Sequence, residues 1–212
     1  MRWAGLLPAA AALLFFAWLA QQVRHAGTQQ VDERIRMLVH ADASPALTAA
    51  MRGFSLIGQP AVLITLGALV MFWLVRTGRV RTALLFALTV AGAEVLDQLL
   101  KLLFHRPRPA TFFGLAEPMG YSFPSGHSLV SFAFFGALAV AAAARTESRT
   151  RWLYYIGAAI PIAAIGLSRI YLGMHYPSDV LGGWAAAAVW LFSVTLAWRW
   201  RDGDGAFGGR GH

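Results

Sequence analysis

The sequence predicts an all-α protein built as a bundle of six transmembrane helices, on the basis of its composition and its long apolar runs. Of the 212 residues, 58% are hydrophobic and 13% are charged, whereas soluble domains carry about 25% charged residues. A helix needs about 20 mostly apolar residues to cross a bilayer. Six such runs are present, at residues 6–23, 55–75, 82–104, 128–144, 152–170 and 180–200. We therefore expect a single membrane domain, residues 1–201, and a disordered glycine-rich tail, residues 202–212.

The first run, residues 6–23, is expected to remain in the protein as a helix. A secretory signal peptide is the alternative, because Arg2 precedes the run and small residues lie near Ala20. Cleavage after Ala20 would place Trp18 where a small residue is required, and Pro8 and the length of the run also favour a retained helix.

The loop after the first run contains apolar and charged residues at helical spacing. The apolar residues are Val31, Ile35, Leu38 and Val39, and the charged ones are Asp32, Glu33, Arg34 and Arg36. This pattern is typical of an amphipathic helix that lies in the outer membrane interface. A solvated excursion is the alternative.

The basic residues outside the runs orient the bundle. With six helices, both termini share a side with the second and fourth loops, and that side holds ten of the 18 Lys and Arg residues. These ten form short Arg clusters without a chemical motif, whereas several of the other eight belong to motifs. We therefore expect both termini in the cytoplasm and the first, third and fifth loops outside.

Composition limits the chemistry and the partners. The chain has no cysteine, which excludes disulfides, a thiol nucleophile and a thiolate metal site. Its net charge is +8, which suits nucleic acid, anionic lipid headgroups or a phosphorylated substrate. Nucleic-acid binding is not expected, because the Arg residues are divided between two membrane faces.

A first polar cluster, Lys-Leu-Leu-Phe-His-Arg-Pro-Arg-Pro, occupies residues 101–109. Pro107 and Pro109 disfavour helix in the residues before them, so the third run ends here and continues as an extended segment. Lys101 and Arg108 can then reach one anion. Basic anchors at the membrane interface are the alternative interpretation.

A second cluster, Tyr-Ser-Phe-Pro-Ser-Gly-His-Ser at residues 121–128, directly precedes the fourth run. Ser125 is a candidate cap, and the free N–H groups of a first helical turn bind anions well. Gly126 allows close approach of a phosphate to the backbone. His127 could donate a proton to a leaving oxygen. A cap with a neighbouring structural histidine is the alternative.

The third cluster lies between the fifth and sixth runs. Asp179 follows His175 by four residues, at the start of a helix opened by Pro177. Its carboxylate could accept a hydrogen bond from one imidazole nitrogen and leave the other free as a nucleophile. Arg169 adds a cation. Two unrelated loop residues are the alternative for the His–Asp pair.

Together, the ordered patterns K-x6-R-P, P-S-G-H and S-R-x5-H-x3-D resemble the type 2 phosphatidic acid phosphatase (PAP2) superfamily over residues 50–200. These membrane lipid phosphatases share a site and fold with vanadium haloperoxidases. The resemblance implies that His175 attacks phosphorus, that Asp179 orients it, and that His127 protonates the leaving oxygen. It implies phosphate binding by Lys101, Arg108, Ser125, Gly126 and Arg169. It also implies that no metal or other cofactor is used.

Two acidic residues lie within the third apolar run. Glu94 and Asp97 share one helix face with Lys101, and charged groups at membrane depth usually face the protein interior. We expect Asp97, and with it Glu94, to hold Lys101 in position. A purely structural interhelical bond is the alternative.

The resemblance favours a bacterial inner-membrane enzyme that hydrolyses the terminal phosphate of a lipid phosphate at the outer face. The preferred substrate is a polyprenyl diphosphate such as undecaprenyl diphosphate. Phosphatidylglycerophosphate and phosphatidic acid are alternatives, because each presents a terminal phosphoryl group on an apolar tail. A lipid phosphotransferase, a vanadate-dependent haloperoxidase and a transporter are alternative functions. The expected partners are the lipid phosphate and the surrounding membrane lipids.

Overall fold

The computed structural model describes residues 6–116, 119–146 and 149–205, and within these ranges the protein consists of helices and loops without a β-strand. The helices are α1 (Leu6–Arg24), α2 (Gln29–Ala41), α3 (Pro45–Ile57), α4 (Pro60–Arg76), α5 (Val80–Phe104), α6 (Gly126–Ala143), α7 (Arg151–Tyr171) and α8 (Pro177–Gly205). The all-α prediction is therefore confirmed.

Five helices in the described part of the chain are long and apolar enough to cross a membrane, namely α1, α5, α6, α7 and α8. The pair α3 and α4 meets the same criterion only together and is bent by 54°. Among the described residues the bundle thus has five candidate membrane spans, or six if the bent pair counts as one.

The expectation of one continuous helix over residues 55–75 is wrong. The chain leaves helix α3 at Ile57 and begins α4 at Pro60. Proline has no N–H group and favours the first position of a helix. The apolar character continues across this break, so hydropathy alone does not reveal it.

The last helix is longer than expected at both ends. Helix α8 begins at Pro177 and continues to Gly205, which includes the start of the expected tail. The rest of that tail, residues 206–212, and the N-terminal residues 1–5 lie outside the described residues.

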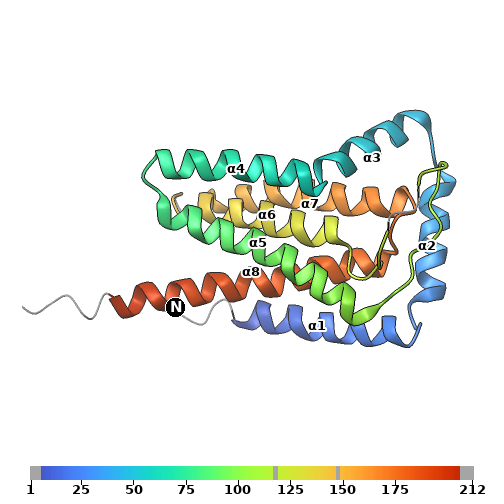
Figure 1. Ribbon diagram of the computed structural model, residues 1–212, viewed down its shortest axis with the longest axis horizontal. Coiled ribbons are helices and arrows are strands. Elements are labelled where there is room, and N and C mark those ends of the chain that lie inside the picture. Colours follow the sequence, from blue (N-terminus) through green and yellow to red (C-terminus); the bar gives the residue numbers. More distant parts are fainter. Residues whose placement is uncertain (1–5, 117–118, 147–148, 206–212) are drawn as a thin grey trace, which may run out of the picture.

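Helix α2 lies across one end of the bundle, roughly perpendicular to the long helices (Figure 1). The helix expected in the first loop is therefore present. Its charged face packs against the protein, with Asp32 and Arg36 only 2% and 3% exposed, whereas Val31 and Leu38 are 59% and 61% exposed. The buried charges have partners in the loops beneath α2, described below.

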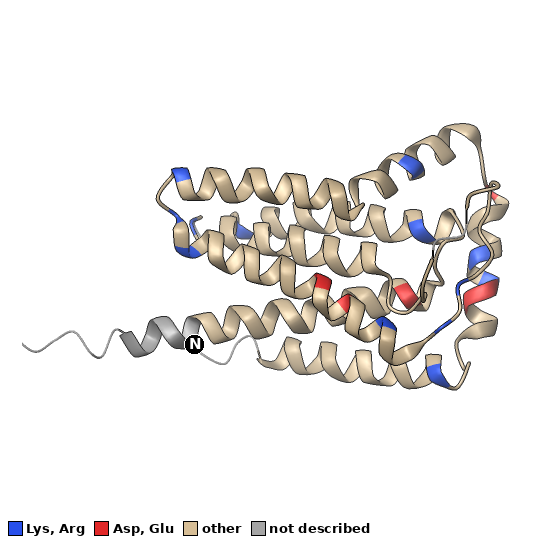
Figure 2. Ribbon diagram, in the orientation of Figure 1, with Lys and Arg blue, Asp and Glu red and all other residues tan. Residues whose placement is uncertain are grey.

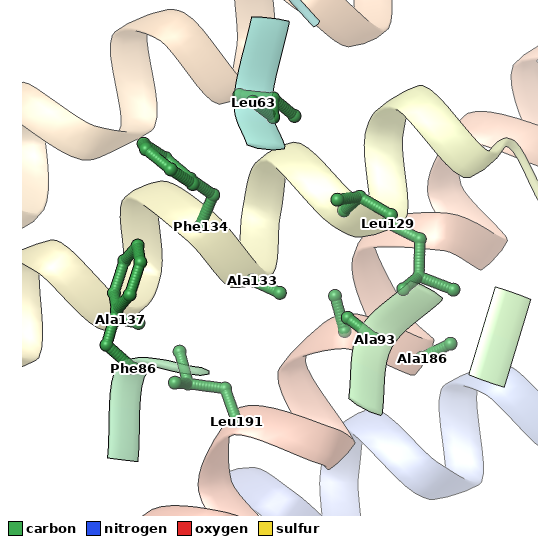
Figure 3. Close-up of a cluster of buried hydrophobic side chains, with 11 residues drawn as sticks. Leu63, Phe86, Ala93, Leu129, Ala133, Phe134, Ala137, Ala186 and Leu191 are labelled. Atoms are coloured by element: carbon green, nitrogen blue, oxygen red, sulfur yellow. The ribbon is translucent and has the colours of Figure 1, made fainter. Parts of the chain in front are cut away.

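The core surrounds α6, which contacts α4, α5, α7 and α8. Leu63 of α4, Phe86 of α5 and Leu129 of α6 belong to this core, and each is at most 3% exposed (Figure 3). Alanines such as Ala93 and Ala133 fill the remaining positions. Small residues allow helices to approach closely in a membrane protein, so this core holds the spans in a fixed arrangement.

Charged residues concentrate at the two ends of the bundle, and the ribbon between them is almost entirely uncharged (Figure 2). The end crossed by α2 carries both basic and acidic residues, whereas the opposite end carries basic residues. This distribution is typical of a multi-pass membrane protein. The end crossed by α2, where acidic and basic residues occur together, is the place to look for a polar site.

Candidate active site

The three polar clusters of the sequence meet at the end of the bundle that α2 crosses. The N–H of Ser122 donates to the carbonyl of Arg106 at 2.8 Å, which joins the first cluster to the second. The N–H of Ser125 donates to the carbonyl of Asp179 at 2.9 Å, which joins the second to the third. Residues from three separate helix ends therefore form one site.

His175 and Asp179 are paired at the start of α8. His175 Nδ1 lies 3.4 Å from Asp179 Oδ2, and the two residues are 2% and 0% exposed. Asp179 also accepts hydrogen bonds from Ser122 Oγ at 2.7 Å, the Tyr176 N–H at 2.8 Å and Arg106 Nη1 at 2.7 Å. These donors fix the orientation of the carboxylate and, through it, the imidazole ring.

Arg108 determines which nitrogen of His175 carries the proton. Arg108 Nη1 lies 3.2 Å from His175 Nε2. A guanidinium group only donates, so Nε2 accepts with its lone pair, and Nδ1 holds the hydrogen directed at Asp179. The lone pair of the imidazole therefore lies beside a cation that can bind an anionic substrate, as nucleophilic attack on a phosphate requires.

Burial sets the charge of His175. Removal from water lowers the pKa of the imidazole most, the hydrogen bond and the charge of Asp179 oppose this, and the positive charges of Arg169 and Arg108 lower it further. The resulting pKa is about 4. The ring is therefore neutral and nucleophilic at neutral pH. Burial also lowers the pKa of Arg108, although an arginine in a protein keeps its charge.

Two further nitrogens at the site are buried without a hydrogen-bond partner among the described residues, namely His127 Nε2 and Arg169 Nε. Buried polar atoms are nearly always paired. Arg169 uses Nη1 to donate to Ser55 Oγ of α3, which holds the guanidinium in place and leaves Nε available. His127 lies in the first turn of α6, within electrostatic reach of Arg169, Lys101 and Arg108. Both nitrogens are therefore free to form a hydrogen bond within the site.

The N-terminus of α6 packs against the end of α5. Ser125 is the cap residue and is fully buried. A Cβ atom on Gly126 would lie 2.7 Å from Asp97 Oδ2 and 2.8 Å from Lys101 Nζ, so a larger residue here would push the ends of both side chains aside. The free N–H groups of a first turn bind anions. An anion at this position would meet the helix N-terminus and the ammonium group together.

The acidic residues of the third apolar run differ in what they contact. The buried Asp97 forms an ion pair with Lys101, whereas Glu94 accepts a hydrogen bond from Gln98 at 3.0 Å. Asp97 is thus placed to hold Lys101 from one turn earlier in α5, and Glu94 is not. Across the described ranges, no group of three or more His, Cys, Asp or Glu residues could hold a metal ion.

Several residues around the His–Asp pair were not among the expected site residues. Arg106 and Ser122 bind the Asp179 carboxylate, and Ser55 binds Arg169. Asp32 of α2 binds Arg106 at 2.8 Å. No local pattern indicates these roles, because the partners are separated by 57 to 114 residues in the sequence.

Comparison with known proteins identifies relatives over most of the chain. The family model of the PAP2 superfamily matches residues 82–203. Phosphatidylglycerophosphatase B of Bacillus subtilis is 30% identical over 85% of this chain and 90% of its own length. Undecaprenyl-diphosphatase of Sulfolobus acidocaldarius is 26% identical over 87% of each chain.

The crystal structure of a transmembrane PAP2-type phosphatidylglycerolphosphate phosphatase from Bacillus subtilis superimposes with a TM-score of 0.79 and 29% identity. It covers 88% of this chain and 94% of that one. The resemblance read from the three motifs is thereby confirmed, and so is the expectation of a multi-pass membrane protein from a family of lipid phosphatases. This chain belongs to the PAP2 superfamily.

Proposed function

We propose that this protein removes the terminal phosphate from a membrane lipid phosphate or diphosphate through a phosphohistidine formed on His175. The observation that carries the proposal is the geometry of His175, whose Nδ1 faces Asp179 and whose Nε2 faces Arg108. A neutral, oriented imidazole beside a phosphate-binding cation is equipped for attack on phosphorus.

In the first step, Nε2 of His175 forms a bond to phosphorus as the bond from phosphorus to the leaving oxygen breaks. The electron pair of that bond passes to the leaving oxygen, and His127 supplies its proton. Asp179 stabilises the positive charge that develops on the imidazole. The products of this step are the phosphohistidine and a lipid alcohol, or a lipid monophosphate where the substrate is a diphosphate.

In the second step, water attacks the phosphohistidine. His127 takes a proton from the water, which returns this residue to its starting state. The bond from phosphorus to Nε2 breaks, and orthophosphate leaves. No proton or electron is gained or lost by the protein over the cycle.

Cations and backbone donors stabilise the transferring phosphoryl group in both steps. Their role is to bind the three equatorial oxygens, where charge is spread in the transition state. The groups assigned to this role are Lys101, Arg108, Arg169, Ser125 and the N–H of Gly126. In the proposed mechanism these groups supply the positioning and the charge, without a metal ion.

The site is proposed to face the outside of a bacterial inner membrane, with both termini in the cytoplasm. Support comes from the Arg clusters of the two loops at the opposite end of the bundle, because basic residues favour the cytoplasmic side. Those loops and the adjoining helix ends carry Arg76, Arg79, Arg81, Arg145, Arg149 and Arg151. An outward site suits a polyprenyl diphosphate, the preferred substrate, with phosphatidylglycerophosphate and phosphatidic acid as the alternatives.

A substrate panel tests the proposal. Purified protein in detergent is given undecaprenyl diphosphate, phosphatidylglycerophosphate and phosphatidic acid, and released phosphate is measured with and without EDTA. We expect hydrolysis of at least one lipid, undiminished by EDTA, and the highest kcat/KM for the diphosphate. No release from any lipid would contradict the proposed activity, and loss of activity in EDTA would contradict the metal-free mechanism.

The Asp97–Lys101 pair gives a separate prediction. Asp97→Asn removes the charge that holds Lys101, and we expect kcat/KM to fall about 10- to 100-fold, because small displacements of a positioning group have effects of this size. Glu94→Gln is expected to have a smaller effect, since Glu94 does not contact Lys101. Unchanged turnover and KM in Asp97→Asn would leave Asp97 a purely structural role.

A further inference from the structure

Asp32 reaches the candidate active site from α2, a helix that precedes the family match at residues 82–203. Its side chain is 2% exposed. Oδ2 accepts hydrogen bonds from Arg106 Nη2 at 2.8 Å and from Ser178 Oγ at 2.6 Å. Oδ1 accepts from the Ser178 N–H at 2.9 Å. Both oxygens are therefore bound to segments that flank the His–Asp pair.

Arg106 lies between two buried carboxylates. Nη2 binds Asp32, and Nη1 binds Asp179 Oδ1 at 2.7 Å. The guanidinium also lies over the ring of Tyr176, 4.1 Å from its centroid. A continuous line of polar contacts thus runs from Asp32 through Arg106 and Asp179 to His175.

The anchoring of α2 does not depend on Asp32 alone. Arg36, one turn later, donates to the carbonyl of Ala110 at 2.6 Å and packs over the rings of Phe112 and Tyr176. Loss of the Asp32 charge therefore leaves α2 attached to the loops beneath it. The loss removes one of the two carboxylates that bind the Arg106 guanidinium, and only Asp179 remains.

We propose that Asp32 is a positioning residue for the reaction, acting on His175 through Arg106 and Asp179. With Asp32 in place, Arg106 is held from both sides and presents Nη1 to a single oxygen of Asp179. The other oxygen then stays directed at His175 Nδ1. This inference rests on the proposed phosphatase activity and assigns a role in it to a helix outside the family match.

Asp32→Asn is the decisive variant, because asparagine keeps the size of the side chain and one acceptor oxygen. Its amide NH2 group would face Arg106 Nη2, and because both groups are donors, no hydrogen bond could form between them. The side-chain oxygen could still accept the hydrogen bond from the Ser178 N–H. We expect kcat to fall about tenfold, with KM changed less than twofold, since Asp32 does not touch substrate. The rate of phosphohistidine formation in a single turnover should fall by the same factor.

A double-mutant cycle separates positioning from general destabilisation. In an Arg106→Gln background the connection to Asp179 is already broken, so adding Asp32→Asn should lower kcat less than twofold further. Asp42→Asn is the matched control, because Asp42 is an exposed acid at the C-cap of the same helix. It should retain wild-type kcat. If Asp32→Asn does not fold, Ser178→Ala gives a second test, because Ser178 Oγ donates to Asp32 and accepts from Arg106 Nη1 at 2.7 Å. A fall in kcat of about threefold is expected.

The outcomes distinguish the inference from the proposed function. Wild-type kcat in Asp32→Asn would overturn the inference and leave the proposed phosphatase activity standing. The same holds if Asp32→Asn lowers kcat by an equal factor in the wild-type and Arg106→Gln backgrounds. A rise in KM with unchanged kcat would also overturn it, because Asp32 would then act on binding. Absence of lipid phosphatase activity in the wild type would overturn both.

Discussion

His175→Ala is expected to lower kcat by about 10⁴-fold or more on whichever lipid the wild type hydrolyses, because it removes the atom that bonds to phosphorus. Substrate binding should change little, since the cations that bind phosphate remain. The measurement is phosphate release, together with trapping of a radiolabelled phosphoenzyme. The wild type should yield a phosphoenzyme that is labile to acid and stable to base, and the variant should yield none.

His105→Ala serves as the matched control for His175→Ala. His105 is an exposed histidine that packs against Tyr121, and it has no role in the proposed chemistry. It should retain wild-type turnover and label. Substantial turnover in His175→Ala, or labelling that persists there, would show that another residue is the nucleophile.

The second large effect is expected for Asp179→Asn, with a fall in kcat on the order of 10³- to 10⁴-fold, as when the carboxylate behind a catalytic histidine becomes an amide. Both oxygens of Asp179 accept from donors, Arg106 on one side and Ser122, Tyr176 and His175 on the other. An amide NH2 group on either side would face a donor. The ring of His175 would then lose its fixed tautomer.

Ser122→Ala provides the comparison for Asp179→Asn. It removes one of the donors to Asp179 and keeps the carboxylate, so a fall of only a few-fold is expected. Steady-state kcat and KM, with thermal unfolding of each variant, separate lost chemistry from lost stability. Retention of more than about a tenth of wild-type kcat in Asp179→Asn would contradict the orienting role.

The parts of the fold that were predictable depend on local pattern. Apolar length marks a span wherever it occurs, so helices α1, α5, α6, α7 and α8 were expected close to their observed positions. The break before Pro60 was not expected, because the apolar character of the sequence continues across it. Helical spacing predicted α2, yet spacing cannot tell which face of a helix packs on the protein, since that depends on partners far away in the sequence.

In the site too, the features that follow from local sequence could be predicted, and those that depend on distant residues could not. His175 and Asp179 are four residues apart at a helix start, so their pairing could be expected from spacing. The positions of Lys101 and Gly126 followed from helix ends marked by proline and serine. The contacts of Arg106 with Asp32 and Asp179, separated by 74 and 73 residues, arise only when the bundle closes. Tertiary contacts of that kind leave no signal in one sequence.

The inverted orientation of α2 has a consequence for protein engineering. A designer who wished to make this protein water-soluble would ordinarily keep the apolar residues of an amphipathic helix and vary the charged ones. Here the exposed side chains include Val31, Ile35 and Leu38, whereas Asp32 and Arg36 are buried. A soluble redesign therefore has to replace the apolar face with polar residues and keep the charged face as it stands.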